Sequence, residues 1–256
     1  MQARRRELRS RWTAGGPLFG IFVRLSHEDV FETIGLTSVD LVVLDAEHGS
    51  LDRERLNRCL LAAQAVDIPV LVRLPGADLQ AVQHCMSIGA QGVIIPHVNS
   101  ADDIAPLARF AKGKAIERAY AGAGRASLQR TMGWEVFRAE MMARFVVVAQ
   151  LDEPECLDDA EAVAAIDEID GLFLGTIGFA LSQRTALSPA ARQAGLEGIC
   201  RLGRAQGRML GISLTDSAAA RDWRAHGVSL YVVDSDAAVL RKGIEDRIGQ
   251  FRSAVT

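Results

Sequence analysis

The chain lacks the features that would place it in a membrane or on nucleic acid. Aromatic residues make up only 5% of its 256 residues, and no apolar run is long enough to cross a bilayer. Lys and Arg together number 29 against 32 Asp and Glu, so the net charge of −3 offers no basic field to nucleic acid or to an anionic membrane surface. We therefore expect no nucleic-acid partner and no membrane partner.

Cysteine is also scarce. The four positions, Cys59, Cys85, Cys156 and Cys200, form no C-x-x-C pair and no Cys/His pair with the spacing of metal ligands. Such cysteines are expected to be small buried hydrophobes in a reducing compartment. The charged N-terminus lacks the apolar core of a signal peptide, so we expect a cytoplasmic protein.

The chain does contain a regular alternation of short apolar runs with longer amphipathic ones. Segments such as Arg53–Ala65 and Asp102–Phe110 have apolar residues at helical spacing. Eight units of this kind predict one α/β domain over residues 1–256, a (β/α)8 (TIM) barrel. A dinucleotide-binding fold is disfavoured because no G-x-G-x-x-G follows the first strand. The eight expected strands are Leu18–Val23, Leu41–Leu44, Val70–Val72, Val93–Ile95, Val146–Leu151, Leu172–Leu174, Met209–Leu214 and Leu230–Val233.

One stretch, residues 113–143, departs from this alternation. It contains the glycine-rich run Ala121–Arg125, followed by a helical pattern around Met132–Met142. Glycines with an arginine can cradle a phosphate, but the run matches no phosphate-loop pattern. We interpret residues 113–143 as a partly helical insertion that forms a flexible loop over the mouth of the barrel.

Polar side chains follow the strands at their carboxyl ends, where barrel enzymes carry their chemistry. After the second strand comes Asp45-Ala46-Glu47-His48-Gly49, and His48 is the leading catalytic candidate. A histidine, an arginine, an amide and a carboxylate at one mouth suit a small anionic substrate whose carbonyl must be polarised. The other polar residues at strand ends are Arg73, His97, Gln150, Asp152, Gly175–Gly178, Asp234 and Asp236.

Structural alternatives exist for the two leading residues. His48 can be a histidine that is satisfied within a strand-to-helix turn. Arg73 can be held in an ion pair with Asp45 or Glu47, because a guanidinium suits carboxylate ligands and structural pairs equally well. Strand alternation places Gln150 on the same face as Asp152.

Several phrases of the sequence closely resemble the HpcH/HpaI aldolase family. The resemblance covers nearly the whole chain in the right order. It implies a (β/α)8 barrel that acts as a carbon–carbon lyase or aldol-type condensing enzyme on a pyruvate- or oxaloacetate-like 2-oxo acid, through an enolate held by a divalent metal, Mg²⁺ or Mn²⁺. The phrases are Leu44–Gly49, Val72–Pro75, Ile88–Pro96, Gln150–Asp152 and Ile169–Gly175.

The resemblance also implies roles for single residues. His48 would be the base that moves the proton of the aldol hydroxyl, and Arg73 would stabilise the enolate oxygen. Gln150 would hold the substrate, whose carboxylate would bind the backbone amides of Gly175, Thr176, Ile177 and Gly178. Relatives form trimers and hexamers, often by exchanging C-terminal helices, which predicts a homo-oligomer built on Pro189–Ala205 and Ala237–Phe251; packing of these helices on their own barrel is the alternative.

The sequence departs from the family pattern at its acidic positions. Asp152 stands where the family has a metal-ligating glutamate, and Gly178 stands where it has a ligating aspartate. Ser87 aligns with the aspartate that partners the catalytic histidine in several relatives. Because hard-cation affinity follows ligand charge and geometry, we expect weak or absent binding of a divalent metal, with Glu47 or Asp45 available to compensate. A divergent member that acts as a binding protein, or as a metal-independent enzyme on another carbonyl acid, is the alternative function.

Overall fold

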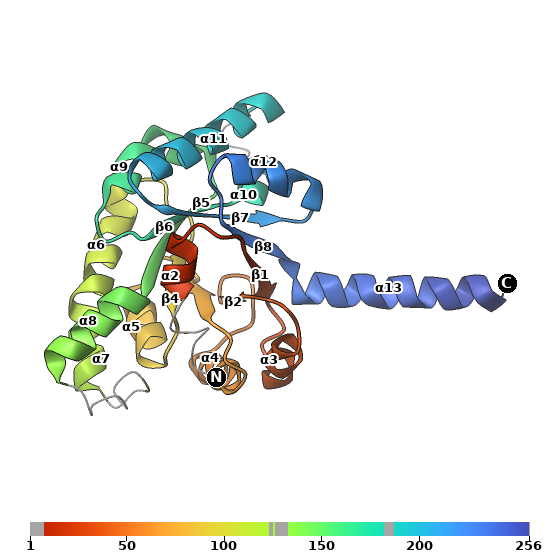
Figure 1. The fold of residues 1–256 in the computed structure, drawn as a ribbon, viewed down its shortest axis with the longest axis horizontal. Helices are drawn as coiled ribbons and strands as arrows, with labels where there is room; N and C mark the ends of the chain where they lie inside the picture. The colour runs from red at the N-terminus through yellow and green to blue at the C-terminus, as the bar shows by residue number, and fades with distance from the viewer. Residues whose placement is uncertain (1–7, 123–124, 126–132, 182–186, 256) are drawn as a thin grey trace.

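The computed structural model describes residues 8–122, 125, 133–181 and 187–255. Eight parallel strands, β1 to β8, pair in sequence order and close into a barrel, with helices around it (Figure 1). The predicted (β/α)8 barrel is therefore confirmed. The strands are β1 (Leu18–Val23), β2 (Leu41–Asp45), β3 (Val70–Arg73), β4 (Gly92–Ile95), β5 (Val146–Leu151), β6 (Gly171–Leu174), β7 (Met209–Leu214) and β8 (Leu230–Ser235).

Helices connect the strands, and several begin at side-chain caps that the sequence provides. Asp52, Asp78 and Ser100 each accept a hydrogen bond from a backbone N–H of the helix that follows, and Ser100 forms a full capping box with Asp103. The helices are α2 (Leu8–Thr13), α3 (Glu28–Gly35), α4 (Arg53–Ala65), α5 (Leu79–Ser87), α6 (Ala101–Lys112), α7 (Lys114–Ala121), α8 (Trp134–Arg144), α9 (Ala160–Ala165), α10 (Thr176–Leu181), α11 (Pro189–Ala205), α12 (Ala220–Ala225) and α13 (Asp236–Val255), with 3₁₀ turns η2 (Pro154–Asp158) and η3 (Ser217–Ala219). No described helix combines the length and the apolarity needed to span a bilayer.

The core has two layers, because successive residues of a strand point to opposite faces. The outer layer lies between the strands and the helices and contains all four cysteines, which are buried and free as predicted. The inner layer fills the barrel with side chains such as Leu41, Val43 and Phe173. At its lower end Leu8 and Trp12 of α2, each 1% exposed, pack into the same cluster and close the barrel.

Residues 113–143 contain two described helices, α7 and α8, and the glycine-rich run between them lies largely outside the described residues. These helices follow α6 and lead into β5, and α7 packs on α5 and α6. Arg125 donates from Nε to the carbonyl oxygen of Ile88 at the end of α5, 2.8 Å away. The segment thus belongs to the amino ends of the strands, so its expected place over the mouth is wrong: a helix that follows a strand returns the chain to the opposite end.

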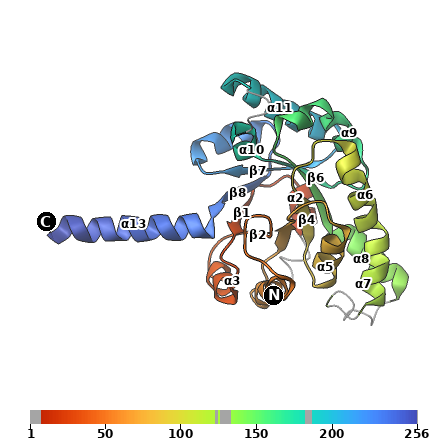
Figure 2. The same ribbon diagram turned by 180° about the vertical axis from the view of Figure 1, so that it is seen from behind.

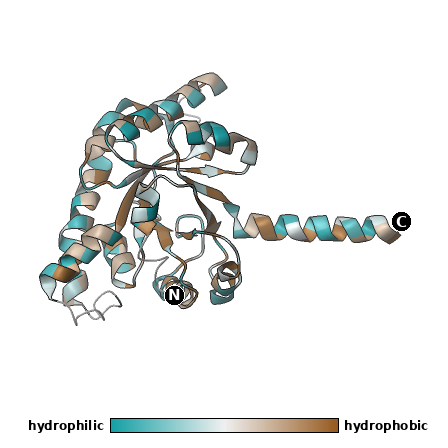
Figure 3. Cartoon of the chain, in the orientation of Figure 1, coloured by the Kyte–Doolittle hydropathy of each residue, from teal (hydrophilic) through white to brown (hydrophobic). Residues whose placement is uncertain are grey.

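The last helix, α13, leaves the barrel and projects away from it (Figures 1 and 2). Among its residues only Asp236 is buried. Large apolar side chains recur along it every three or four residues and are exposed, and Figure 3 shows the hydrophobic bands that result. They are Val239, Leu240, Ile244, Ile248, Phe251 and Val255. The described part of the barrel therefore leaves the apolar face of α13 uncovered.

Candidate active site

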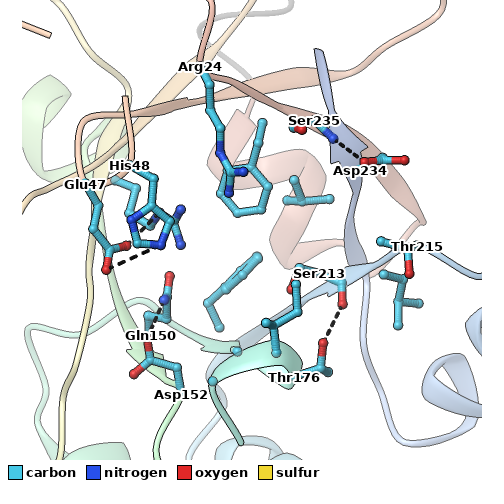
Figure 4. A pocket seen from close by; sticks show the side chains of 18 of the residues that line it. Arg24, Glu47, His48, Gln150, Asp152, Thr176, Ser213, Thr215, Asp234 and Ser235 are labelled. Atoms are coloured by element: carbon cyan, nitrogen blue, oxygen red, sulfur yellow. Dashed lines mark hydrogen bonds and ion pairs between the residues drawn. The ribbon is translucent and has the colours of Figure 1, made fainter. Parts of the chain in front are cut away.

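The carboxyl ends of the strands surround a pocket of about 470 Å³ (Figure 4). Strand alternation explains which side chains reach it. On β5, Val146 and Val148 lie inside the barrel, so Gln150 and Asp152 follow them on the same inward face and emerge into the pocket. The residues predicted to act on the substrate or a metal line this pocket: Glu47, His48, Arg73, Gln150, Asp152, Gly175, Thr176, Ile177 and Gly178.

Asp45 and Arg73 form the floor of the site. The two residues are register partners on β2 and β3, and Asp45 accepts from Arg73 Nε at 3.0 Å and from Nη2 at 2.6 Å. Arg24 adds a third hydrogen bond to Asp45, at 2.9 Å. Burial by itself raises the pKa of Asp45, but the hydrogen bonds and the charge of Arg73, with the bond from Arg24, outweigh it and hold the pKa below its usual range.

The sequence left two roles open for Arg73, a structural ion pair and a contact with the substrate, and the structure is compatible with both. It is ion-paired with Asp45, and its Nε lies 3.1 Å from Glu47 Oε2. It also lines the pocket, and its guanidinium lies 4.7 Å from the centre of the Phe22 ring. Nη1 makes no hydrogen bond within the described part of the chain, so donors on Arg73 stay available to a ligand.

His48 lies at the rim of the pocket, where its side chain is 55% exposed and its Nε2 is 4.0 Å from Glu47 Oε1. The backbone N–H of His48 donates to Asp45 Oδ1 at 3.2 Å, which fixes the turn that carries it. Gly49 permits this turn, because a Cβ there would overlap the carbonyl oxygen of Asp45. His48 is therefore positioned by its backbone, and its ring can reach a ligand.

Gln150 and Asp152 interact as strand alternation predicts: Gln150 Nε2 donates to Asp152 Oδ2 at 2.6 Å. Gln150 Oε1 and Asp152 Oδ1 are buried without a hydrogen-bond partner in the described chain. Burial is the main cause of a raised pKa at Asp152; Glu47 and Glu153 raise it further, and Gln150 and His97 oppose the shift.

The glycines of the β6–α10 loop pack directly on Asp152. A Cβ at Gly175 would overlap the Asp152 side chain, and a Cβ at Gly178 would overlap its carbonyl oxygen. The amide of Gly175 is used within the fold, because it donates to Leu151 O at 3.0 Å. The next amides, from Thr176 to Gly178, form the first turn of α10, where helix N–H groups have no partner inside the helix.

His97 is the site residue that the sequence reasoning undervalued. It follows β4 with a positive φ of 55°, which is uncommon outside glycine. Its Nε2 lies 2.7 Å from Glu47 Oε1, and its Nδ1 lies 3.5 Å from both Asp152 Oδ2 and Glu153 Oε1. The signal was its place at a strand end, but nothing in the sequence gives the direction of its ring.

Ser87 has no place in the site. It ends α5 and accepts a hydrogen bond from Gln83 of the same helix at 3.0 Å. It does not line the pocket, so within this chain it does not take the place of the aspartate that partners the catalytic histidine in several relatives. A residue at the end of a barrel helix lies near the amino ends of the strands, far from the mouth.

The wall formed by β1, β7 and β8 completes the pocket. Arg24 points into it, opposite hydroxyl groups that Figure 4 labels, among them Ser213 and Ser235. Asp234 lines the pocket, but Asp236 does not. Instead Asp236 accepts from the backbone N–H groups of Arg24 and Leu25 at 3.0 and 2.9 Å, so its predicted place in the mouth is wrong.

The chain belongs to the HpcH/HpaI aldolase/citrate lyase family, whose model matches residues 18–242. It is 30% identical over 171 residues to a 4-hydroxy-2-oxovalerate aldolase of Novosphingobium aromaticivorans, an alignment that covers 66% of this chain and 64% of that relative. It is 28% identical over 232 residues to a 4-hydroxy-2-oxovalerate aldolase of Rhodococcus jostii, covering 89% of both. A crystal structure of a family protein from Burkholderia cenocepacia superposes with a TM-score of 0.84 at 25% identity, covering 96% of this chain and 99% of that one.

Family members are generally aldolases that depend on a divalent metal, so the pocket must be tested as a metal site. Glu47 and Asp152 supply two carboxylates, but Gly178 has no room for an acidic side chain and His97 stands between the two acids. Across the described residues, no group of three or more His, Cys, Asp or Glu has a metal-holding arrangement. The residues of the pocket therefore do not fit a divalent metal ion in their present arrangement.

Proposed function

We propose that this protein is a carbon–carbon lyase, or the corresponding aldol-type condensing enzyme, and that it acts on a pyruvate-like 2-oxo acid through an enolate. The observation that carries the proposal is the convergence of His48, Arg73 and Gln150 on one pocket in a chain of an aldolase family. The relatives named as 4-hydroxy-2-oxovalerate aldolases support the same substrate class.

Arg73 stabilises the negative charge that develops on the 2-oxo oxygen. When the C3–C4 bond of a 4-hydroxy-2-oxo acid breaks, its electron pair moves to that oxygen as an enolate. The guanidinium is held rigidly by Asp45, through bonds of 3.0 and 2.6 Å, so donors on its open side need no reorganisation during the reaction. Asp45 thus acts as a positioning residue for Arg73.

His48 moves the proton. In the cleavage direction its ring accepts the proton of the 4-hydroxyl as the aldehyde forms, and in the synthetic direction it returns the proton. Its exposed position at the rim places it between the floor and the solvent. Gln150 and the amides of Thr176, Ile177 and Gly178 hold the 2-oxo acid. Gln150 Oε1, which is buried without a hydrogen-bond partner among the described residues, supports a ligand contact there.

Deuterium exchange into the methyl group of pyruvate, followed by NMR, tests the proposal. Exchange needs only enolate formation, so it requires no knowledge of the acceptor aldehyde. We expect exchange by the purified protein and its loss in Arg73→Lys. A folded wild-type protein that catalyses no exchange, and no cleavage of 4-hydroxy-2-oxo acids, would instead favour the alternative of a binding protein on the same fold.

We propose that the protein binds Mg²⁺ or Mn²⁺ only weakly, and that Asp152 and Glu47 are the candidate ligands. Of the family's two ligand positions only Asp152 keeps a carboxylate, because Gly178 stands at the other, and hard-cation affinity follows ligand charge and geometry. Asp152 Oδ1, a buried carboxylate oxygen without a hydrogen bond in the described chain, supports a residual affinity for cations. Glu47 Oε2 already faces Arg73 Nε at 3.1 Å.

We further propose a homo-oligomer, a trimer or hexamer, in which α13 of one copy packs on the barrel of another. An apolar groove of about 650 Å³ at the base of α13 supports this, since it lies between α3, β1 and β8 and is lined by side chains such as Ile21, Val30 and Val39. The uncovered apolar stripe of α13 has the matching chemistry. A cytoplasmic location, which the free buried cysteines support, completes the proposal.

A further inference from the structure

We propose that His97 occupies the position which a divalent cation would need between Glu47 and Asp152, so that the chain itself supplies the partner of these two carboxylates. The inference rests on the proposed function only for the identity of the pocket. Nε2 faces Glu47 Oε1 at 2.7 Å, while Nδ1 faces Asp152 Oδ2 at 3.5 Å. The imidazole is therefore a spacer, with Glu47 on the side of Nε2 and Asp152 on the side of Nδ1.

The spacer keeps the two acids apart. Mg²⁺ and Mn²⁺ require ligand oxygens at about 2.0–2.2 Å from the ion, whereas here a whole ring separates Glu47 Oε1 from Asp152 Oδ2. Glu153 Oε1, 3.5 Å from Nδ1, adds a third carboxylate around the same ring. Three acids around one imidazole make a site for a hydrogen-bond donor that is built within the protein.

The backbone holds the ring in this place. His97 has a φ of 55°, a backbone conformation that is unfavourable for a residue other than glycine. The loop is fastened to the end of β5 on the far side of His97, because the amide of Val98 donates to Gln150 O at 3.2 Å and Asn99 Nδ2 donates to Glu153 Oε2 at 2.9 Å. Strain that is kept in place by neighbouring bonds is typical of functional positions.

Binding of Mn²⁺, followed by electron paramagnetic resonance of the free ion, tests the inference on the full-length protein. In His97→Gly the positive φ is free of strain and the space between Glu47 and Asp152 opens to a hydrated ion. We expect its Mn²⁺ dissociation constant to fall at least about tenfold below that of the wild type. His97→Asn is the second variant if glycine prevents folding, because asparagine also tolerates a positive φ.

His48→Gly is the matched control, since His48 also approaches Glu47 Oε1, at 4.0 Å, but does not stand between the acids. It should leave Mn²⁺ affinity unchanged. Two results overturn the inference: an unchanged affinity in folded His97→Gly, or a weaker one, which would make His97 a metal ligand. Metal binding is measured without turnover, so a failure of pyruvate exchange bears on the proposed function and leaves this result intact.

Discussion

Asp45 and Arg73 face each other across β2 and β3, and the single carboxylate of Asp45 accepts from two nitrogen atoms of the Arg73 guanidinium. Both side chains are buried: Arg73 is 8% exposed and Asp45 is not exposed at all. An ion pair at the floor of a pocket can be purely structural, or it can aim a cation at the substrate. Substitutions of Arg73 and of Asp45 distinguish these two roles.

Replacing Arg73 with lysine keeps the charge and removes the planar fork. We expect Arg73→Lys to reduce pyruvate exchange about 30- to 1000-fold, which corresponds to a loss of about 2–4 kcal/mol in transition-state stabilisation. The exchange rate is measured by NMR on protein whose circular dichroism matches the wild type. An exchange rate that survives in this variant would assign Arg73 a structural role only.

Asp45→Asn removes the charge beneath Arg73 and leaves the buried guanidinium with Glu47 as its ionic partner. We expect the free energy of unfolding at pH 7 to fall by about 3 kcal/mol, as for other broken buried pairs. Because the pKa of Asp45 is lowered in the folded state, its contribution is complete above the ordinary carboxyl pKa and is lost as the pH falls through the folded value. Urea unfolding at several pH values should show the difference from wild type shrinking in acid; a constant difference would contradict this account.

Asp152→Asn should act in the opposite direction. Burial raises the pKa of Asp152, so the ionised side chain costs stability above that raised pKa, and the cost disappears as the pH falls through it. We expect the variant to melt at a higher temperature than the wild type at pH 7, and the gain to vanish below the ordinary carboxyl pKa. Asparagine can still accept from Gln150. An unchanged melting temperature at pH 7 would show that the acid is better solvated than its burial implies.

Gly178 should resist any side chain, because a Cβ there would overlap the carbonyl oxygen of Asp152. Gly178→Ala is expected to lower the free energy of unfolding by about 1–3 kcal/mol, as overpacking does elsewhere. Gly76→Ala is the control, since a Cβ at Gly76 meets nothing within 4 Å and should be near neutral. Equal stabilities of the two variants, measured by denaturant unfolding, would mean that the β6–α10 loop adjusts freely. The same overlap argues against restoring the family's acid by Gly178→Asp.

The exposed stripe of α13 should govern assembly. We expect Ile244→Asp combined with Ile248→Asp to reduce an oligomer to a monomer of 27.6 kDa in light scattering, because charges on the stripe cannot be buried against a neighbour. Val136→Asp on α8 is the control, since Val136 is similarly exposed but lies away from α13. A wild-type protein that is already monomeric would refute the assembly.

Most of the barrel could be predicted from the sequence, because the period of apolar residues carries that information directly. The strands Leu18–Val23 and Val146–Leu151 begin and end where their apolar runs do. Strand alternation likewise brought Gln150 and Asp152 to the same face.

The rest depends on features that periodicity does not encode. The ring of His97 points between two acids because of one positive φ after β4. The stripe on α13 predicts a buried face, but it does not say which barrel covers that face. The place of the 113–143 segment follows from the path of the chain around the barrel, which local sequence cannot reveal.

Leu8 and Trp12 close one end of the barrel, so among the described residues the active-site pocket opens at the other end. Trp12 is held there by a hydrogen bond from Nε1 to Leu210 O, at 3.3 Å. Reactants and products of the proposed reaction then pass through the same opening of the pocket. The proposed reaction holds the 2-oxo acid fragment against Arg73 at the floor and leaves the aldehyde fragment nearer the opening. We therefore expect the aldehyde to leave first and pyruvate second.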